Sequence, residues 1–344
     1  MQEHYDGTKL LSMRDINGGV PEIYMVESNR SDGKTTYFGR YFVNRFLNNG
    51  EKFALLYRFD YELSDIPDKF FKDIKELFFP EHTMTCKSKA KAKYYDLFID
   101  DVHCGYGIAL NNADSIKKYS HMFSDVTRIL IDEFQSETNH YCDDEIKKFR
   151  SIHTSISRGA NKQVRYVPVF MLSNCVTLLN PYYVALDITD RLRDDTKFLK
   201  GDGFILEHHF NETVSKAQQE SAFNRAFKDN AHLAYETQNV YLNDCKTFIA
   251  KVDGKSRYVC TLKYMGNEYA IREFAEEGIM YCDDRADKTF PIKISVTTDD
   301  HDINYVMLKR NDFLLSNLRY LFEHGCFRFR NLQSKDAVLN ALKY

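Results

Sequence analysis

A Gly-Lys-Thr tripeptide between an apolar run and a helical pattern restricts the fold of this 344-residue chain more than any other feature. Residues 26–38 read VESNRSDGKTTYF, whereas a phosphate-binding loop of the Walker A type reads G-x-x-x-x-G-K-[ST], so Ser28 stands at the first glycine. The sequence predicts a short strand over 22–27 and a helix over 35–48. A strand, a loop and a helix in this order turn the N–H groups at the helix start toward a bound phosphate.

The loop residues have predicted roles in binding ATP. Lys34 is expected to reach the β- and γ-phosphates, and Thr35 to hold Mg²⁺. Ser28 should add backbone strain without removing ligands, since the phosphates are held mainly by N–H groups near Gly33 and Lys34. The alternative is a solvated turn before a helix, because a bare Gly-Lys-Thr is common. The predicted cofactor-binding residues of the loop are Ser28, Asn29, Arg30, Ser31, Asp32, Gly33, Lys34, Thr35 and Thr36.

A second apolar strand ends in two adjacent acids, as the Walker B pattern does. Residues 127–134 read TRILIDEF. Asp132 is expected at the end of the strand beside the phosphate loop, holding Mg²⁺ through water, and Glu133 is expected to polarise the attacking water. Another strand, 52–59, lies between the two motifs. This combination predicts an α/β P-loop ATPase domain of the additional-strand, catalytic-glutamate type.

Three further polar residues are candidates for the same site. Asn174 follows an apolar strand over 166–174 and is either a sensor of the γ-phosphate or part of a turn. Arg158 ends a predicted helix, where it either complements the negative helix end or reaches a neighbour's site as an arginine finger. Arg58, at the end of the second strand, is a candidate for phosphate or interface contacts.

The pattern of the chain changes twice. Residues 1–209 alternate short apolar strands with helices, which predicts a mostly parallel sheet with helices on both faces. Residues 210–236 are polar and helix-forming, and we expect a helical linker there. Residues 237–344 predict a smaller α+β domain, with an antiparallel meander over TFIAKVD, YVCTLKYMG, EYAIREF and GIMYC, then one strand and two helices.

Composition excludes some classes of partner. The net charge of −3 gives no general attraction to nucleic acid, so any such binding must come from local patches. No apolar run approaches the roughly 20 residues that cross a bilayer, and we expect no membrane contact. The eight cysteines lack metal-ligand spacing, which predicts reduced thiols in an intracellular protein.

Two basic segments are candidates for contact with nucleic acid. Residues 86–95 read CKSKAKAKYY, and on a strand the four lysines would share one face. That face could equally be a solvated edge that blocks aggregation. In CFRFRN, two arginines alternate with two phenylalanines, which suits a nucleic-acid contact, an acidic partner or a half-buried strand. The candidate residues are Lys87, Lys89, Lys91, Lys93, Arg328 and Arg330.

Taken together, these residues resemble the DNA-packaging ATPases of phi-29-like tailed bacteriophages, which are relatives of terminase large subunits. The resemblance covers most of the chain. It is carried by the segments VNRFLNNGEKFALLYRFDYEL, VTRILIDEF, MLSNCVTLLNPYY, TTDDHDINYVML and LRYLFEHGCFRFRN.

The resemblance implies a motor that uses ATP and Mg²⁺ to move double-stranded DNA into a preformed capsid. Its partners would be the portal or connector of the procapsid and further copies of the chain in a ring of five. It would act in the host cytoplasm and transiently at the portal vertex. Some relatives also dock on a scaffold RNA, and the sequence leaves that partner open.

The resemblance also assigns individual residues. Lys34 and Thr35 take the Walker A roles, Asp132 and Glu133 the Walker B roles, and Asn174 falls in the strand-end sensor motif. The implied trans-acting finger is Arg158, and Lys118 lies near a lysine that contacts DNA. Residues 237–344 would form an RNase H-like domain that has lost its metal-binding acids.

Two other functions remain open on these residues. One is a different ring-forming P-loop DNA translocase. The other is an inactive P-loop protein that serves as a structural ring or RNA-binding adaptor, which only Ser28 favours.

Overall fold

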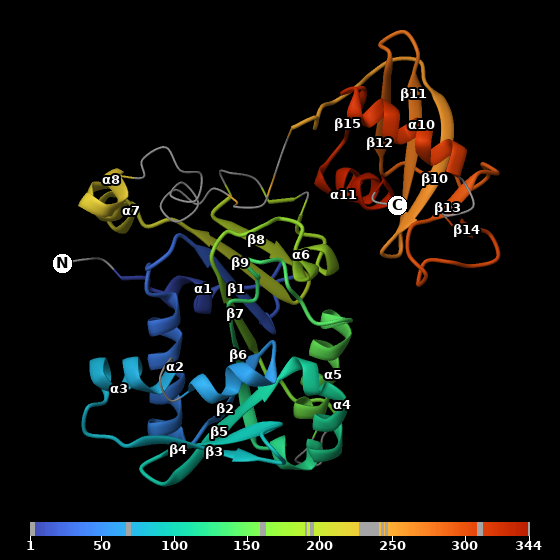
Figure 1. Ribbon diagram of the computed structural model, residues 1–344. Coiled ribbons are helices and arrows are strands. Elements are labelled where there is room, and N and C mark those ends of the chain that lie inside the picture. The colour runs from blue at the N-terminus through green and yellow to red at the C-terminus, as the bar shows by residue number, and fades with distance from the viewer. Residues whose placement is uncertain are drawn as a thin grey trace. The chain divides into compact units, whose positions relative to one another are not determined.

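The computed structural model describes residues 4–66, 70–158, 163–189, 191–192, 196–226, 241, 244, 247–307 and 312–342. The chain forms two compact units, Met1–Asn243 and Asp244–Tyr344 (Figure 1). Of the helical linker predicted over 210–236, residues 227–236 lie outside the described part. The rest of that segment contains two helices of the first unit, α7 and α8.

A nine-stranded sheet forms the centre of the first unit, in the order β3-β4-β5-β2-β6-β7-β1-β9-β8. The six strands from β5 to β9 are parallel, and antiparallel hairpins extend the sheet at both ends. The predicted, mostly parallel sheet is therefore confirmed. The strands are β1 Ile23–Ser28, β2 Lys52–Tyr57, β3 Met84–Lys89, β4 Tyr94–Ile99, β5 Val102–Ala109, β6 Val126–Asp132, β7 Val169–Ser173, β8 Phe198–Gly201 and β9 Phe204–His209.

The strand order corrects one sequence expectation. Asp132 was expected on the strand next to the phosphate loop, but β7 lies between β1 and β6. A parallel connection needs a crossover of a dozen or more residues, so neighbours in sequence need not pair in the sheet. The carboxyl ends of β1, β7 and β6 nevertheless meet at one edge of the sheet.

Helices cover both faces of this sheet, with α2 and α3 on one side and α4 and α5 on the other (Figure 1). The helices are α1 Thr8–Ser12, α2 Lys34–Asn49, α3 Lys72–Phe78, α4 Ala113–Ile116, α5 Glu145–Ser157, α6 Pro181–Ala185, α7 Glu212–Glu220 and α8 Ala222–Ala226. The short 3₁₀ helices are η1 Asp60–Asp65, η3 Leu110–Asn112 and η4 Lys117–Phe123.

Helix α2 positions the candidate site, and its own sequence explains why it forms. Phe38, Phe42 and Phe46 recur every four residues and are buried against the sheet. Each such burial stabilises the fold by about 1.5–3 kcal/mol. Gly50 ends the helix in the left-handed region, at φ 68°, and its N–H donates to the Phe46 carbonyl at 2.8 Å.

The second unit contains a six-stranded sheet in the order β14-β13-β10-β11-β12-β15. The predicted meander is confirmed for its last three strands, but residues 247–253 form no strand beyond one bridge between Ile249 and Phe329. The elements are β10 Arg257–Tyr264, β11 Asn267–Phe274, β12 Ile279–Asp283, β13 Lys293–Ser295, β14 Val306–Met307, α10 Asp312–Glu323, β15 Phe327–Phe329 and α11 Leu332–Leu342. Within the described ranges, we find no helix with the length and apolarity needed to span a membrane.

Candidate functional site

The loop between β1 and α2 borders a cavity of about 610 Å³. Gly33 lies in the left-handed region, at φ 96°, where a side chain would be strained, and it directly precedes α2. The first N–H groups of a helix have no partner within the helix, so those at the start of α2 are available to an anion. The other cavity residues near the loop are Arg30, Ser31, Asp32, Lys34, Thr35, Thr36, Asp132, Glu133, Ser173 and Asn174.

Lys34 joins the ends of β1 and β7. Its buried ammonium donates to Asn174 Oδ1 at 2.8 Å and to Ser28 Oγ at 3.3 Å. Burial lowers the pKa of Lys34, and the charges of Asp132 and Asp32 oppose that shift. The structure thus brings the predicted phosphate-binding lysine and the predicted sensor amide into direct contact.

Ser28 differs from its expectation. Its φ is not positive, so the backbone strain expected from replacing the first glycine is absent. Ser28 completes strand β1 as an ordinary extended residue, and its hydroxyl accepts a hydrogen bond from Lys34. The strained loop residue is instead Ser31, at φ 64°.

Thr35 and Asp132 form the predicted metal pair. Thr35 Oγ1 donates to Asp132 Oδ1 at 3.3 Å, across the intervening strand β7. Burial, and secondly the charge of Glu133, raise the pKa of Asp132 to about 6. A hydroxyl and a carboxylate next to an anion-binding loop are the hard oxygen ligands that Mg²⁺ prefers, so these residues fit that ion.

Glu133 follows the strand in an unusual backbone conformation. Its φ is 56°, a region that costs a non-glycine residue about 1–3 kcal/mol and that is frequent at functional sites. Its side chain is exposed and lines the cavity. A carboxylate held at the edge of the cavity can take a proton from a water molecule there.

Two residues of the loop, Asn29 and Asp32, anchor it to Asn211. Asn29 is buried, and its Oδ1 accepts from the Asn211 backbone N–H at 3.0 Å. Asp32 is also buried; its Oδ1 accepts from the Asn211 side chain at 2.9 Å and lies 3.5 Å from His209 Nε2. Sequence reasoning missed Asn211. The available signal was its place at the start of a helix, where its Oδ1 caps Val214 at 3.1 Å.

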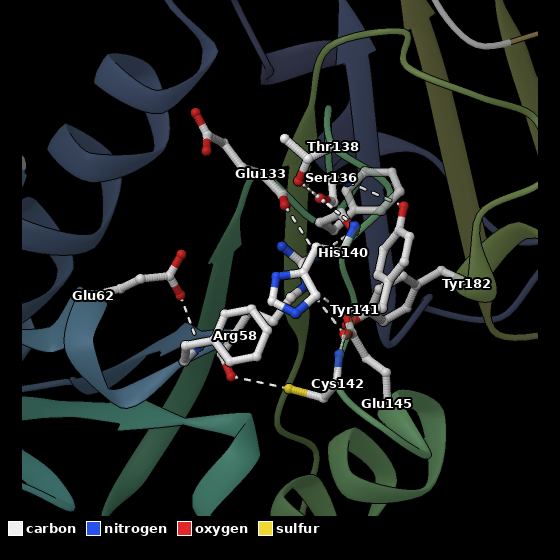
Figure 2. Close-up of polar contacts among 12 residues, drawn as sticks. Arg58, Glu62, Glu133, Ser136, Thr138, His140, Tyr141, Cys142, Glu145 and Tyr182 are labelled. Carbon is white, nitrogen blue, oxygen red and sulfur yellow. Dashed lines mark hydrogen bonds and ion pairs between the residues drawn. The ribbon is translucent and has the colours of Figure 1, made fainter.

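Arg58, a predicted cofactor-binding residue, lies in an ion pair outside the lining of the cavity. Arg58 does not line the cavity, and its guanidinium is bound to the buried carboxylate of Glu145 at 3.1 Å (Figure 2). A second nitrogen donates to the backbone carbonyls of Phe134 at 2.8 Å and Glu133 at 3.3 Å. Through these two hydrogen bonds, Arg58 holds the chain that follows Glu133. The carboxylate of Glu145 compensates the burial of the guanidinium.

This ion pair predicts a large effect on stability. Arg58→Met should lower the free energy of unfolding by about 3–5 kcal/mol, because Glu145 would stay buried without its cation. Urea unfolding monitored by circular dichroism measures the change. Lys147→Met is the control, since that side chain is 82% exposed in its pair with Asp144 and should change little. Equal shifts in the two variants would contradict the buried-pair interpretation.

Arg158 lies far from Lys34 within one chain. It follows α5, is exposed, and borders a second cavity together with Ile23 and Val169. Those two residues begin β1 and β7, whereas the loop with Lys34 follows the other end of β1. A strand rises about 3.3 Å per residue, so the two sites lie roughly 16 Å apart or more. Within its own chain, Arg158 therefore does not reach the cavity beside Lys34.

The lysine segment is a turn as well as a strand. Lys87 and Lys89 lie on edge strand β3, but β3 ends at Lys89, and residues 90–93 form the turn to β4. The sequence predicted that the four lysines share one face of a strand. That prediction is wrong, because only two of them lie on β3. Positive φ values at Ala90, Lys91 and Ala92 make the turn. Lys89 pairs with Asp96 at 3.4 Å, and Lys93 donates to Ser115 at 2.9 Å.

The other basic candidates differ in their surroundings. Lys118 is exposed on η4. In the second unit, Phe327 and Phe329 are buried and the arginines alternate with them, as expected for a half-buried strand. Arg328 donates to the Gly325 carbonyl at 2.8 Å, and Arg330 pairs with Asp284 at 2.6 Å.

The fold and the site define an α/β protein whose candidate site lies at the carboxyl edge of a parallel sheet, where proteins of this class commonly bind their ligands. The chain belongs to the podovirus DNA encapsidation protein (Gp16) family, whose model matches residues 3–343. The resemblance inferred from the sequence is thereby confirmed.

Individual relatives agree with this family. The DNA packaging protein of Bacillus phage phi29 is 25% identical over 331 residues, which cover 95% of this chain and 93% of the relative. A solved structure of the bacteriophage Phi-29 viral genome packaging motor assembly has a TM-score of 0.71 at 23% identity, covering 99% of this chain and 97% of the other. A Phi-28 gp11 DNA packaging motor structure has a TM-score of 0.63 at 18% identity, covering 100% and 99%. Both structures confirm the mixed α/β fold.

Proposed function

We propose that this chain is an ATP-hydrolysing motor that moves double-stranded DNA into a preformed phage capsid. One observation carries the proposal: Lys34, Thr35, Asp132, Glu133 and Asn174, from three separate strand ends, line a single cavity. The chain belongs to a DNA encapsidation family, and for this reason we propose DNA as its substrate and a capsid as the destination. The host cytoplasm and the procapsid portal follow as its place of action.

The cavity suits a nucleoside triphosphate. The α2 N-terminus and Lys34 would bind the phosphates, and Thr35 with Asp132 would hold Mg²⁺, which neutralises phosphate charge when bound. Glu133 would accept a proton from the attacking water. Tyr37, Leu77 and Phe78 also line the cavity, and their apolar side chains suit a nucleobase.

The strand order supports the additional-strand, catalytic-glutamate type. Strand β7, which leads to Asn174, lies between the strand of the phosphate loop and the strand of the acid pair. In the second unit, β10, β11 and β12 are antiparallel, and β13 and β14 add in parallel beside β10. This arrangement supports the RNase H-like fold that the resemblance implies.

A ring with a trans-acting arginine is the second part of the proposal. Arg158 is exposed at the sheet edge opposite the nucleotide cavity, so a head-to-tail ring would present it to the next copy. A ring of five, the portal as docking partner and a scaffold RNA are carried over from the family resemblance alone. The exposed Lys87, Lys89, Lys91 and Lys118 are the candidates for contact with DNA phosphates in the first unit.

Mixing two inactive variants tests the arginine. Arg158→Ala should lose about 10³-fold or more of ATP turnover, because the transition-state charge would lack a cation. Lys34→Ala should also be inactive. Mixed in equal amounts, the two should regain part of the activity, since an intact nucleotide site on one copy then meets an intact Arg158 on its neighbour. No recovery at any mixing ratio would argue against action in trans.

Steady-state ATP hydrolysis tests the function as a whole. The rate should rise when double-stranded DNA is added, and it should rise more than linearly with protein concentration, because a ring must assemble. Hydrolysis that ignores both DNA and concentration would indicate a self-contained ATPase. Absence of any hydrolysis would favour an inactive structural or RNA-binding adaptor.

A further inference from the structure

Glu27 is a completely buried acid directly before the phosphate loop, and four side chains donate to it. Oε1 accepts from His208 Nδ1 at 2.7 Å and from the hydroxyl of Tyr241 at 2.6 Å. Oε2 accepts from the hydroxyl of Tyr183 at 2.7 Å and from Gln135 Nε2 at 3.1 Å. A carboxylate has about four acceptor positions, so this network occupies the whole of its hydrogen-bonding capacity.

Gln135 extends the network to the next two strand ends. Its Nε2 is bound to Glu27, and its Oε1 accepts from the backbone N–H groups of Val176 at 3.1 Å and Thr177 at 2.9 Å. In sequence, Gln135 lies two residues after Glu133, and Val176 lies two residues after Asn174. Glu27 and Gln135 thus connect the ends of β1, β6 and β7. These strand ends lead to the phosphate loop, to the acid pair and to Asn174, all of which line the cavity.

The other donors come from outside these three strands. Tyr183 lies on α6 and His208 on β9. Tyr241 lies three residues before Asp244, where the second unit begins. One carboxylate therefore holds both the loops of the nucleotide site and the chain that leads toward the second unit.

A metal ion is a weaker explanation of the same cluster. Ligand atoms of Glu27, Cys175 and His208 lie within 4.8 Å of one another. However, His208 Nδ1 already contacts Glu27, and burial, followed by the charge of Glu27, raises the pKa of the Cys175 thiol. A protonated thiol is a poor metal ligand. The hydrogen bonds to Glu27 are sufficient to explain why these groups lie together.

We infer that Glu27 is a positioning residue for hydrolysis, and that Tyr241 ties the chain leading toward the second unit to the same carboxylate. Glu27 acts through Gln135, which holds the loops with Glu133 and Asn174 in one register. Nucleotide binding should depend mainly on the start of helix α2, which Phe38, Phe42 and Phe46 hold against the sheet, so we expect it to change less than hydrolysis when this register is lost. The inference rests on the proposed ATPase function.

The variant Glu27→Gln tests the first part. Its amide presents an NH₂ group where the carboxylate accepts two donors, so part of the network must break at nearly unchanged volume. We expect kcat to fall at least about 10-fold. The dissociation constant of an Mg²⁺-bound, non-hydrolysable ATP analogue should change less than about 3-fold. Wild-type kcat in a folded Glu27→Gln protein would overturn the inference, as would equal losses in kcat and affinity.

Further variants keep the test decisive. Gln135→Ala should show the same division between kcat and binding, and it replaces Glu27→Gln if that variant does not fold in thermal melting. Lys34→Ala distinguishes a failure of the proposed ATPase function from a failure of the role of Glu27. If Lys34→Ala hydrolyses ATP normally, the proposed function fails. If Lys34→Ala is inactive while Glu27→Gln and Gln135→Ala behave like the wild type, only the role of Glu27 fails.

A matched pair of tyrosines tests the role of Tyr241 in the chain that leads toward the second unit. Tyr241→Phe and Tyr183→Phe each remove one hydroxyl from the same carboxylate. The ratio of ATP hydrolysis with and without double-stranded DNA should fall at least about 3-fold further in Tyr241→Phe, because only that residue belongs to the connecting chain. Equal ratios in the two variants would overturn this part of the inference.

Discussion

Lys34→Ala is expected to abolish measurable nucleotide binding and to reduce ATP hydrolysis by at least about 100-fold. The lysine is buried at the start of α2, and its ammonium lies among Asn174, Ser28 and the nearby charge of Asp132. Lys34 is the buried cation of the loop, and it is the residue predicted to bind the phosphates. Its removal therefore takes away the positive charge that the phosphates need. Titration with a fluorescent ATP analogue and a phosphate-release assay measure the two losses.

The control for Lys34→Ala is a lysine on another helix of the same unit. Lys216 on α7 is 72% exposed, so Lys216→Ala should bind and hydrolyse like the wild type. Loss of binding in both variants would point to damage of the fold. Normal binding in Lys34→Ala would show that the cavity beside the loop is not the nucleotide site.

Glu133→Gln should retain nucleotide binding and lose hydrolysis by about 10²–10⁴-fold, the usual contribution of a general base. The amide keeps the size of the side chain but cannot take a proton. Glu133 is exposed at the edge of the cavity, and the hydrogen bonds of the Lys34 ammonium go to Asn174 and Ser28, so binding should be little affected. Single-turnover hydrolysis, together with the dissociation constant of ATP, separates chemistry from binding.

Glu137→Gln is a matched control for that variant, because Glu137 is a nearby acid paired with Arg30 on the surface. It should turn over ATP at close to the wild-type rate. Wild-type turnover in Glu133→Gln would exclude Glu133 as the base and would leave another group to activate water. Loss of binding in Glu133→Gln would mean that this acid mainly organises the site.

The sequence predicted the local parts of the site well. A helix over 35–48 corresponds to α2, Lys34–Asn49, and the predicted acid pair lies at the end of β6, with Asp132 as its last residue and Glu133 directly after it. Periodic burial explains this success, since Phe38, Phe42 and Phe46 indicate one face of a helix whatever surrounds it. The same holds for Phe327 and Phe329, whose alternation gave the correct buried face.

Some errors were also local. The lysines at 91 and 93 continue an alternating pattern, yet the chain leaves the strand at Lys89. Alternation of lysine with alanine places no large apolar group on either face, so it does not hold a strand in one register. The strain expected at Ser28 was misplaced for a related reason. The backbone needs a left-handed residue later in the loop, at Ser31 and Gly33.

By itself, the sequence determined which short segments form strands and helices and which polar residues follow them, because such patterns depend on neighbours a few residues apart. Only the tertiary structure decided that β7 lies between β1 and β6, and that Arg58 pairs with Glu145. It also decided that Glu27 receives Tyr241 from 214 residues away. Buried polar groups must be paired, but the partner is set by the packing of the whole chain and leaves no periodic signal.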